Sequence, residues 1–110
     1  MGANSSPLPR TVETAFIAVP HLDAAVKLLG RLRAATGDAV ASFEFLPRIA
    51  VELVTHHIPG VADPLERPYE AYVLCEVSTA RDDLALRALL ESALEQALAD
   101  GLVLDAAFAE

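Results

Sequence analysis

The chain has 110 residues, 54% of them hydrophobic, and its sixteen acidic and eight basic residues give a formal net charge of −8. This length fits one small domain with a single packed core. The negative charge, without any cluster of Lys or Arg, argues against binding to a phosphate backbone, so we expect no nucleic-acid partner. No apolar run approaches the roughly 20 residues that span a bilayer, so we expect no membrane span.

The first half of the chain predicts two strands with a helix between them. Residues 1–10 are rich in Pro and Ser and indicate a flexible lead. Residues 11–19 contain many β-branched residues and stop at a proline, as strands do. Residues 21–37 have a helical period and end at a glycine, and residues 39–45 alternate with a period of two, which favours a strand. The apolar positions of the helical period are Leu22, Ala25, Val26, Leu29 and Leu32.

A second helix and a loop follow. Pro47 suits the first turn of this helix, which we expect to end before Pro59. Residues 61–68 carry two prolines and three charges, a composition typical of a loop. The expected apolar stripe of the helix consists of Ile49, Ala50, Leu53, Val54 and His57.

The last third predicts a strand, a long helix and a final strand. Residues 70–77 alternate, Asp82 can cap the following helix, Gly101 closes it, and residues 103–109 have strand composition. The order β-α-β-α-β-α-β predicts an α+β, ferredoxin-like fold: a four-stranded antiparallel sheet with helices on one face, in which the short helix after the second strand is extra.

Alternation along the strands sorts their side chains between the two faces of the sheet. Towards the helices we expect Phe43, Phe45, Val73, Cys75 and Val77. On the opposite face we expect Val12, Thr14, Phe16, Ser42, Glu44, Tyr72, Leu74 and Glu76. There the carboxylates are interleaved with apolar side chains, which favours a face that covers a ligand or another domain, or that pairs two copies as a homodimer. A solvated outer face explains the same pattern.

The histidines near the end of the second helix are the strongest candidates for a metal site. Glu52 and His56 are four residues apart and His57 follows, but zinc needs three or four convergent ligands, and only Asp63 and Glu66 lie nearby, at no recognised spacing. Histidines in the last turn interact favourably with the helix dipole. We therefore predict no metal ligand and no catalytic residue.

The single cysteine, Cys75, cannot form an internal disulfide and lies in an apolar run. This predicts a buried structural thiol. Because the N-terminus also lacks a secretory signal pattern, we expect a cytoplasmic location.

Three segments in order carry a resemblance to a known family: PLPRTVETAFIAVPHLDAAVKLL, ASFEFLPRIAVELVTHHIPGVADPLERPYEAYVLCEVST and ALEQALADGLVLDAAFAE. They resemble the C-terminal, or cap, domain of the FAD-linked oxidases, which include D-lactate dehydrogenases, the glycolate oxidase flavin subunit and D-2-hydroxyglutarate dehydrogenases. The most specific pieces are SFEF, HIPG, YVLCEV and DGLVLDA.

The resemblance implies that residues 11–110 are part of a cap (substrate) domain that closes over FAD held by another domain of a longer parent chain. The parent would oxidise a small 2-hydroxy acid, and the FAD-binding domain and that substrate would be the partners of this segment. Ser42, Glu44, Tyr72 and Glu76 would face the substrate as pocket wall.

The chain lacks a Gly-rich FAD-binding segment and the downstream His-containing and Glu-His-Gly segments of the family. We therefore expect no bound cofactor and no activity in the isolated chain. The alternative is a free-standing ferredoxin-like module that binds a small ligand or dimerises through its sheet.

Overall fold

The computed structural model describes residues 10–57, 63, 65, 67–80, 83 and 85–109. The predicted flexible lead lies, apart from residue 10, outside the described residues, as does half of the predicted loop 61–68. The elements in chain order are β1 (Thr11–Val19), α1 (Leu22–Ala35), β2 (Val40–Pro47), α2 (Arg48–His57), β3 (Ala71–Thr79), α3 (Leu86–Ala99) and β4 (Asp105–Phe108).

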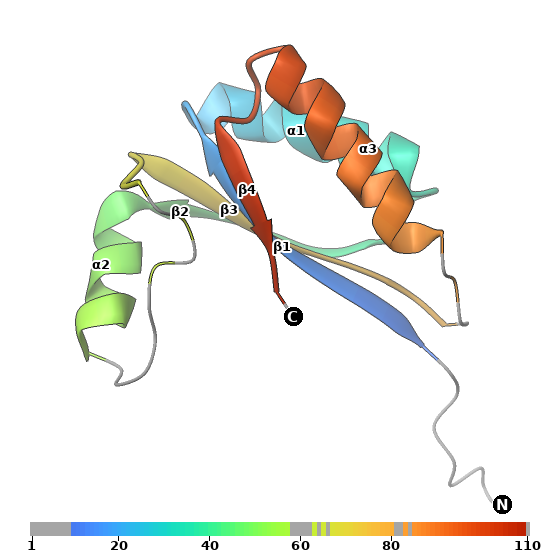
Figure 1. The fold of residues 1–110 in the computed structure, drawn as a ribbon, viewed down its shortest axis with the longest axis horizontal. Coiled ribbons are helices and arrows are strands. Elements are labelled where there is room, and N and C mark those ends of the chain that lie inside the picture. The colour runs from blue at the N-terminus through green and yellow to red at the C-terminus, as the bar shows by residue number, and fades with distance from the viewer. Residues whose placement is uncertain are drawn as a thin grey trace, which may run out of the picture.

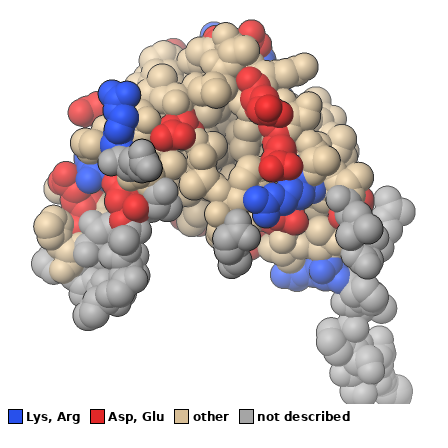
Figure 2. Space-filling view, viewed as in Figure 1, with Lys and Arg blue, Asp and Glu red and all other residues tan. Residues whose placement is uncertain are grey.

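The four strands form one antiparallel sheet in the order β2-β3-β1-β4. This order, with α1 and α3 packed on one face, confirms the predicted ferredoxin-like α+β fold (Figure 1). The helix α2 is the exception to the expected single helical layer. It lies on the other side of the sheet, beyond the ends of β2 and β3, so that the sheet face opposite α1 and α3 is hollowed next to it (Figures 1 and 2). No helix in the described part of the chain is long and apolar enough to cross a bilayer.

The larger core lies between the sheet and the helices α1 and α3. Val73, Cys75 and Val77 are fully buried there, as the alternation predicts. Phe43 packs against this core and is partly buried, whereas Phe45 remains 38% exposed. The difference between prediction and structure at Phe45 arises because β2 is an edge strand, which has a neighbouring strand on one side only.

The predicted apolar stripes of two helices are wrong in part. In α1, Ala25 and Leu32 are buried, but Leu22 and Val26 are more than half exposed. The buried stripe is completed by Ala24 and Leu28. An apolar period fixes the rotation of a helix poorly when apolar residues occupy two neighbouring stripes.

The same error occurs in α2, where Val51 is buried, while Ile49 and Leu53 are 59% and 51% exposed. Of the predicted stripe, Ile49 and Leu53 therefore point to solvent, and Ala50 is partly buried. The side chains of Val54 and His57 lie outside the described part of the structure.

The predicted helix ends are mostly confirmed. Gly37 and Gly101 follow α1 and α3 with φ angles of +66° and +81°, the left-handed region that glycine adopts without strain. At the start of α3 the cap is Ala85, which has no side-chain hydrogen bond. Asp82, the predicted cap, lies outside the described residues. The carboxylate of Asp83 accepts a hydrogen bond from the Ala85 N–H at 3.0 Å instead.

Candidate functional site

The strand register aligns side chains in rows across the hollowed face of the sheet. The first row is Ser42, Glu76 and Thr14, and the second is Glu44, Leu74, Phe16 and Ala107. The third row is Leu46, Tyr72, Ala18 and Asp105. All four predicted substrate-facing residues, Ser42, Glu44, Tyr72 and Glu76, therefore lie on one face.

The first two rows are open. Ser42 and Glu44 are exposed, and Glu76 is partly exposed. Glu44 and Glu76 are diagonal neighbours on adjacent strands, a relation in which residues lie roughly 7–8 Å apart. Two carboxylates beside a serine hydroxyl can accept hydrogen bonds from hydroxyl groups of a ligand, and they repel anions.

The third row is closed by α2 and the segment before β3. Tyr72 is fully buried, and its ring stacks on Phe16 with 4.9 Å between centroids. Val51 and Leu65 are buried against it. Tyr72 thus shapes the floor of this face with its ring, whereas its hydroxyl lies among polar groups of the covering segment.

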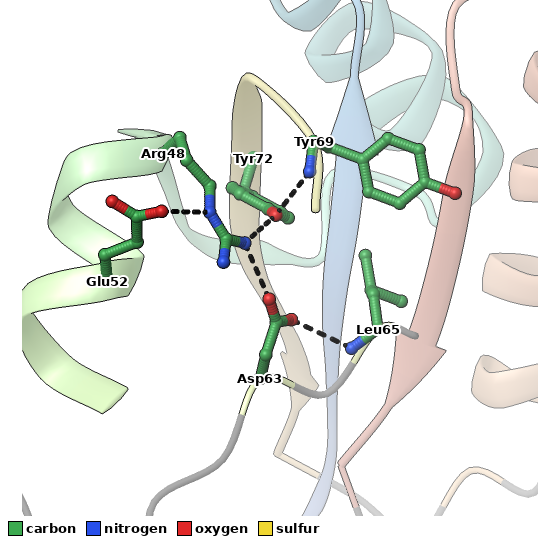
Figure 3. Close-up of polar contacts among 6 residues, drawn as sticks. All are labelled: Arg48, Glu52, Asp63, Leu65, Tyr69 and Tyr72. Atoms are coloured by element: carbon green, nitrogen blue, oxygen red, sulfur yellow. Dashed lines mark hydrogen bonds and ion pairs between the residues drawn. The ribbon is translucent and has the colours of Figure 1, made fainter. Parts of the chain in front are cut away.

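The guanidinium of Arg48, the first residue of α2, is the centre of that polar group (Figure 3). Its Nε donates to Glu52 Oε2 at 3.1 Å, and its Nη1 donates to Asp63 Oδ2 at 2.6 Å and to the Tyr72 hydroxyl at 2.5 Å. The Tyr72 hydroxyl also accepts a hydrogen bond from the Tyr69 N–H at 2.8 Å. One side chain therefore joins α2, the segment after it and β3. We call Arg48, Glu52, Asp63, Tyr69 and Tyr72 the Arg48 cluster.

The positive charge of Arg48 is compensated inside the cluster by the carboxylates of Glu52 and Asp63. The side chains of Arg48 and Asp63 are only 24% and 21% exposed. The hydrogen bond that Arg48 donates to Asp63 is the main reason that the pKa of Arg48 is raised above its ordinary value; partial burial opposes this shift, and the contacts with Tyr72 and Glu52 support it. Because two carboxylates already neutralise this cation, Arg48 is not available to bind a substrate carboxylate without breaking the cluster.

Tyr69 extends the closed region to β4. Its hydroxyl donates to Asp105 Oδ2 at 3.1 Å, and its ring lies edge-on to Tyr72, with 6.3 Å between centroids. The pKa of Tyr69 is raised, first by desolvation and then by the hydrogen bond to Asp105. The segment before β3 is thus attached to both β3 and β4.

Sequence reasoning did not find the Arg48 cluster. The only local signal is the spacing of Arg48 and Glu52, four residues apart on a helix, which is typical of an ion pair. Asp63 and Tyr72 lie 15 and 24 residues from Arg48, at no spacing that indicates contact.

The structure places the other candidate residues as follows. The helix α2 ends at His57, as predicted, and His56 is exposed. In the part of the chain that the structure describes, no three or more His, Cys, Asp or Glu residues gather in a way that could hold a metal ion. Cys75 is buried, and desolvation, assisted by the charge of Glu76, raises its pKa to about 11. A thiol in this environment is a poor nucleophile.

Comparison with known proteins identifies the family. Residues 8–110 match the C-terminal domain of the FAD linked oxidases. The chain belongs to this family. It is 36% identical over 104 residues to a probable mitochondrial D-2-hydroxyglutarate dehydrogenase of Oryza sativa subsp. indica, and 33% identical over 106 residues to the mitochondrial D-2-hydroxyglutarate dehydrogenase of Arabidopsis thaliana. These alignments cover 94% and 96% of this chain.

The chain spans only about a fifth of these relatives, 18% and 19% of their length. A D-2-hydroxyglutarate–pyruvate transhydrogenase of Saccharomyces cerevisiae is 26% identical over 93 residues, 82% of this chain and 19% of the yeast protein. Of the three enzyme types that the resemblance implied, these relatives carry the D-2-hydroxyglutarate type in their names.

The expected cytoplasmic location is wrong. The similar proteins from rice, Arabidopsis and rat are all named as mitochondrial. The inference failed because a lone buried cysteine cannot form an internal disulfide in any compartment, so it does not distinguish one reducing compartment from another.

The family implies FAD, and the hollowed face can be tested for its fit to that cofactor. Phosphates are bound by cations or by free backbone N–H groups at helix N-termini. The open rows carry Glu44 and Glu76 instead, and the guanidinium of Arg48 at their border is already bound to two carboxylates. The described residues of this face therefore do not fit the phosphates of the cofactor.

Proposed function

We propose that residues 11–110 form part of the substrate (cap) domain of an FAD-dependent 2-hydroxy-acid dehydrogenase of the D-2-hydroxyglutarate type. The observation that carries the proposal is the match along almost the whole chain to relatives with that activity in their names. The partner is then the FAD-binding domain of the same parent, and the redox chemistry belongs to the flavin.

In this proposal the segment forms part of the wall of the substrate pocket and contributes no catalytic group. Ser42, Glu44 and Glu76 lie in the open rows, and the buried ring of Tyr72, stacked on Phe16, borders these rows on the same face. The paired carboxylates repel the two carboxylates of a hydroxyglutarate, so this wall favours a substrate position in which its anionic ends point to cations elsewhere in the parent. Exclusion of water and orientation of the substrate are the roles left to this face.

The isolated chain should bind no flavin and oxidise no 2-hydroxy acid. Purified protein should be colourless, and titration with FAD should leave flavin fluorescence unchanged. A stoichiometric yellow complex would contradict this part of the proposal.

A segment exchange tests the role itself. The matching segment of the Arabidopsis relative is replaced by this chain, and flavin content and oxidation of D-2-hydroxyglutarate with an artificial acceptor are measured. We expect the chimera to retain flavin and to oxidise the substrate. A folded chimera that holds flavin but has no activity would contradict the proposal that this chain is equivalent to the segment it replaces.

A pair of charge variants in the same chimera tests the pocket wall. Glu44→Lys with Glu76→Lys should change KM for D-2-hydroxyglutarate while flavin content stays the same. The matched control, Glu91→Lys with Glu95→Lys, changes two exposed carboxylates of α3 on the far side of the sheet and should leave KM unchanged. Equal effects of the two pairs would reject a substrate-facing role for the hollowed face.

A further inference from the structure

Arg48 lies at the border of the open rows and is connected to them. It is the first residue of α2, and its backbone N–H donates to the Glu70 C=O at 2.9 Å, so the start of the helix is attached to the residue just before β3. Its guanidinium donates to the hydroxyl of Tyr72, a residue of the third row. One residue of α2 therefore holds the ring that borders the proposed substrate-facing rows.

Two aromatic rings link this contact to the open second row. The buried Tyr72 ring lies nearly parallel to the Phe16 ring, with 4.9 Å between centroids and 22° between planes. Phe16 is partly exposed and pairs in register with Leu74, which pairs in turn with Glu44. Because protein interiors are close-packed, a displaced Tyr72 ring shifts the Phe16 ring with it. The contact of Arg48 with Tyr72 therefore bears on the row that carries Glu44.

The Tyr72 hydroxyl accepts hydrogen bonds from two different segments. Arg48 Nη1 donates to it from α2, and the Tyr69 N–H donates to it from the segment before β3 (Figure 3). The guanidinium carbon of Arg48 also lies 5.9 Å from the centroid of the Tyr72 ring, within the range of a cation–π contact. Without Arg48 the ring keeps its hydrogen bond from Tyr69 and loses its attachment to α2.

We propose, on the basis of the cap-domain function proposed above, that Arg48 is a positioning residue for the wall of the substrate pocket. Through the Tyr72 hydroxyl it sets the place of the Phe16 ring, and with it the shape of the second row. Arg48 itself does not bind the substrate, because Glu52 and Asp63 compensate its charge. Substitution of Arg48 should weaken substrate binding and leave the turnover of bound substrate unchanged, since the redox chemistry belongs to the flavin.

A purely structural role of Arg48 predicts a different result. A residue that only stabilises α2 changes the fraction of protein that is folded, and the folded fraction then keeps its KM for the substrate. A residue that positions the pocket wall changes KM in protein that is folded and holds its flavin. KM measured against kcat per bound flavin therefore separates the two roles.

NMR spectroscopy of the purified chain tests whether Arg48 positions the second row. In Arg48→Met, the ring resonances of Phe16 and the amide resonance of Leu74 should shift. The matched control is Arg31→Met, which removes a guanidinium that lies 2.6 Å from a carboxylate oxygen, as Arg48 does, but between α1 and the end of α3. The control should leave both resonances in place. Unchanged Phe16 and Leu74 resonances in Arg48→Met would overturn the proposal.

Kinetics of the chimera with the Arabidopsis relative test the effect on the substrate. Arg48→Met should raise KM for D-2-hydroxyglutarate roughly 3- to 10-fold, the size of effect that one hydrogen bond has, at unchanged kcat per bound flavin. Tyr72→Phe removes the hydroxyl that Arg48 contacts but keeps the ring, so it should raise KM by a similar factor. The double variant should not exceed the larger single effect, because both changes break the same contact. Arg31→Met should leave KM unchanged.

An unchanged KM in either single variant would overturn the proposal, as would single effects that multiply in the double variant or an equal rise in Arg31→Met. A fall in kcat at constant KM would also overturn it, because Arg48 would then act in the reaction and not on the pocket wall. If Arg48→Met does not fold, Tyr72→Phe decides alone. In all these cases an active unsubstituted chimera leaves the cap-domain function standing, whereas an inactive unsubstituted chimera would reject that function and the role of Arg48 together.

Discussion

The two sides of the sheet are held by different interactions. Between the sheet and α1 with α3, fully buried aliphatic side chains such as Ile17, Leu28 and Leu90 pack together. On the side of α2, the apolar cluster of described residues is small, and hydrogen bonds of the Arg48 guanidinium and of Tyr69 join the covering segments to the sheet. Apolar packing loses stability in proportion to the volume removed, whereas a polar cluster depends on every partner being present.

This difference predicts two levels of stability in one small domain. The α1 and α3 side should open only with global unfolding, and the α2 side should open locally at lower free energy, because fewer of the described apolar residues are buried there. The proposed substrate-facing rows lie beside the weaker side, so local opening would change the shape of that wall without unfolding the sheet.

The largest expected effect is on the packed side. Leu28→Ala removes a fully buried side chain from the main core and should lower the free energy of unfolding by about 2–5 kcal/mol. Urea denaturation followed by circular dichroism measures this loss. Leu98→Ala, at a 52% exposed leucine, should cost much less, and a similar loss in both variants would show that burial does not control stability here.

The next largest expected effect is the pH dependence that Cys75, on the packed side, gives to the free energy of unfolding. Its pKa in the folded chain is about 11, against an ordinary value of 9.0, so the folded state holds this proton more tightly than the unfolded state. The stability that this provides is complete below pH 9 and is lost between pH 9 and 11, by at most about 2–3 kcal/mol. In Cys75→Ala, the fall in unfolding free energy across that range should be smaller, and an unchanged slope would contradict the assignment to this thiol.

Substitution of Arg48 should destabilise the α2 side of the sheet and leave the α1 and α3 side unchanged. Arg48→Met keeps much of the length of the side chain but removes the guanidinium donor from Asp63 and from the Tyr72 hydroxyl, and the loss of such a donor to partly buried groups costs about 1–3 kcal/mol. Native-state hydrogen exchange should accelerate in α2 and around Tyr69, while the amides of β1 and α1 keep their protection. Uniform acceleration across the chain would mean that the two sides unfold as one unit.

The sequence indicated the fold more completely than the site. Alternation in β1 and β3 and the glycines after α1 and α3 are local signals, and each led to the correct element or helix end. Helix rotation was missed in α2, because Ile49, Leu53 and Val51 are all apolar and only tertiary packing selects Val51 for burial.

The four predicted face residues could be placed together because alternate residues of a strand lie on the same face of the sheet. That Tyr72 is buried could not be foreseen, since the residues covering it come from α2 and from the segment before β3. The Arg48 cluster could not be foreseen for the same reason. Its contacts join residues that are distant in the chain, and no spacing in the sequence indicates these contacts.

The smallest expected effect comes from an ion pair that looks equally strong on distance alone. Arg31 Nη1 donates to Asp100 Oδ2 at 2.6 Å, the distance that also joins Arg48 to Asp63. Arg31 and Asp100 are 41% and 54% exposed, however, so water and salt screen the pair, and pairs of this kind contribute about 1 kcal/mol or less. Arg31→Met should therefore change the free energy of unfolding less than Arg48→Met does, and its small effect should fall further as salt is added. Urea denaturation of both variants at low and high salt measures the contrast directly. If Arg31→Met cost as much as Arg48→Met, the difference between the two sides of the sheet could not be attributed to the partial burial of the Arg48 cluster.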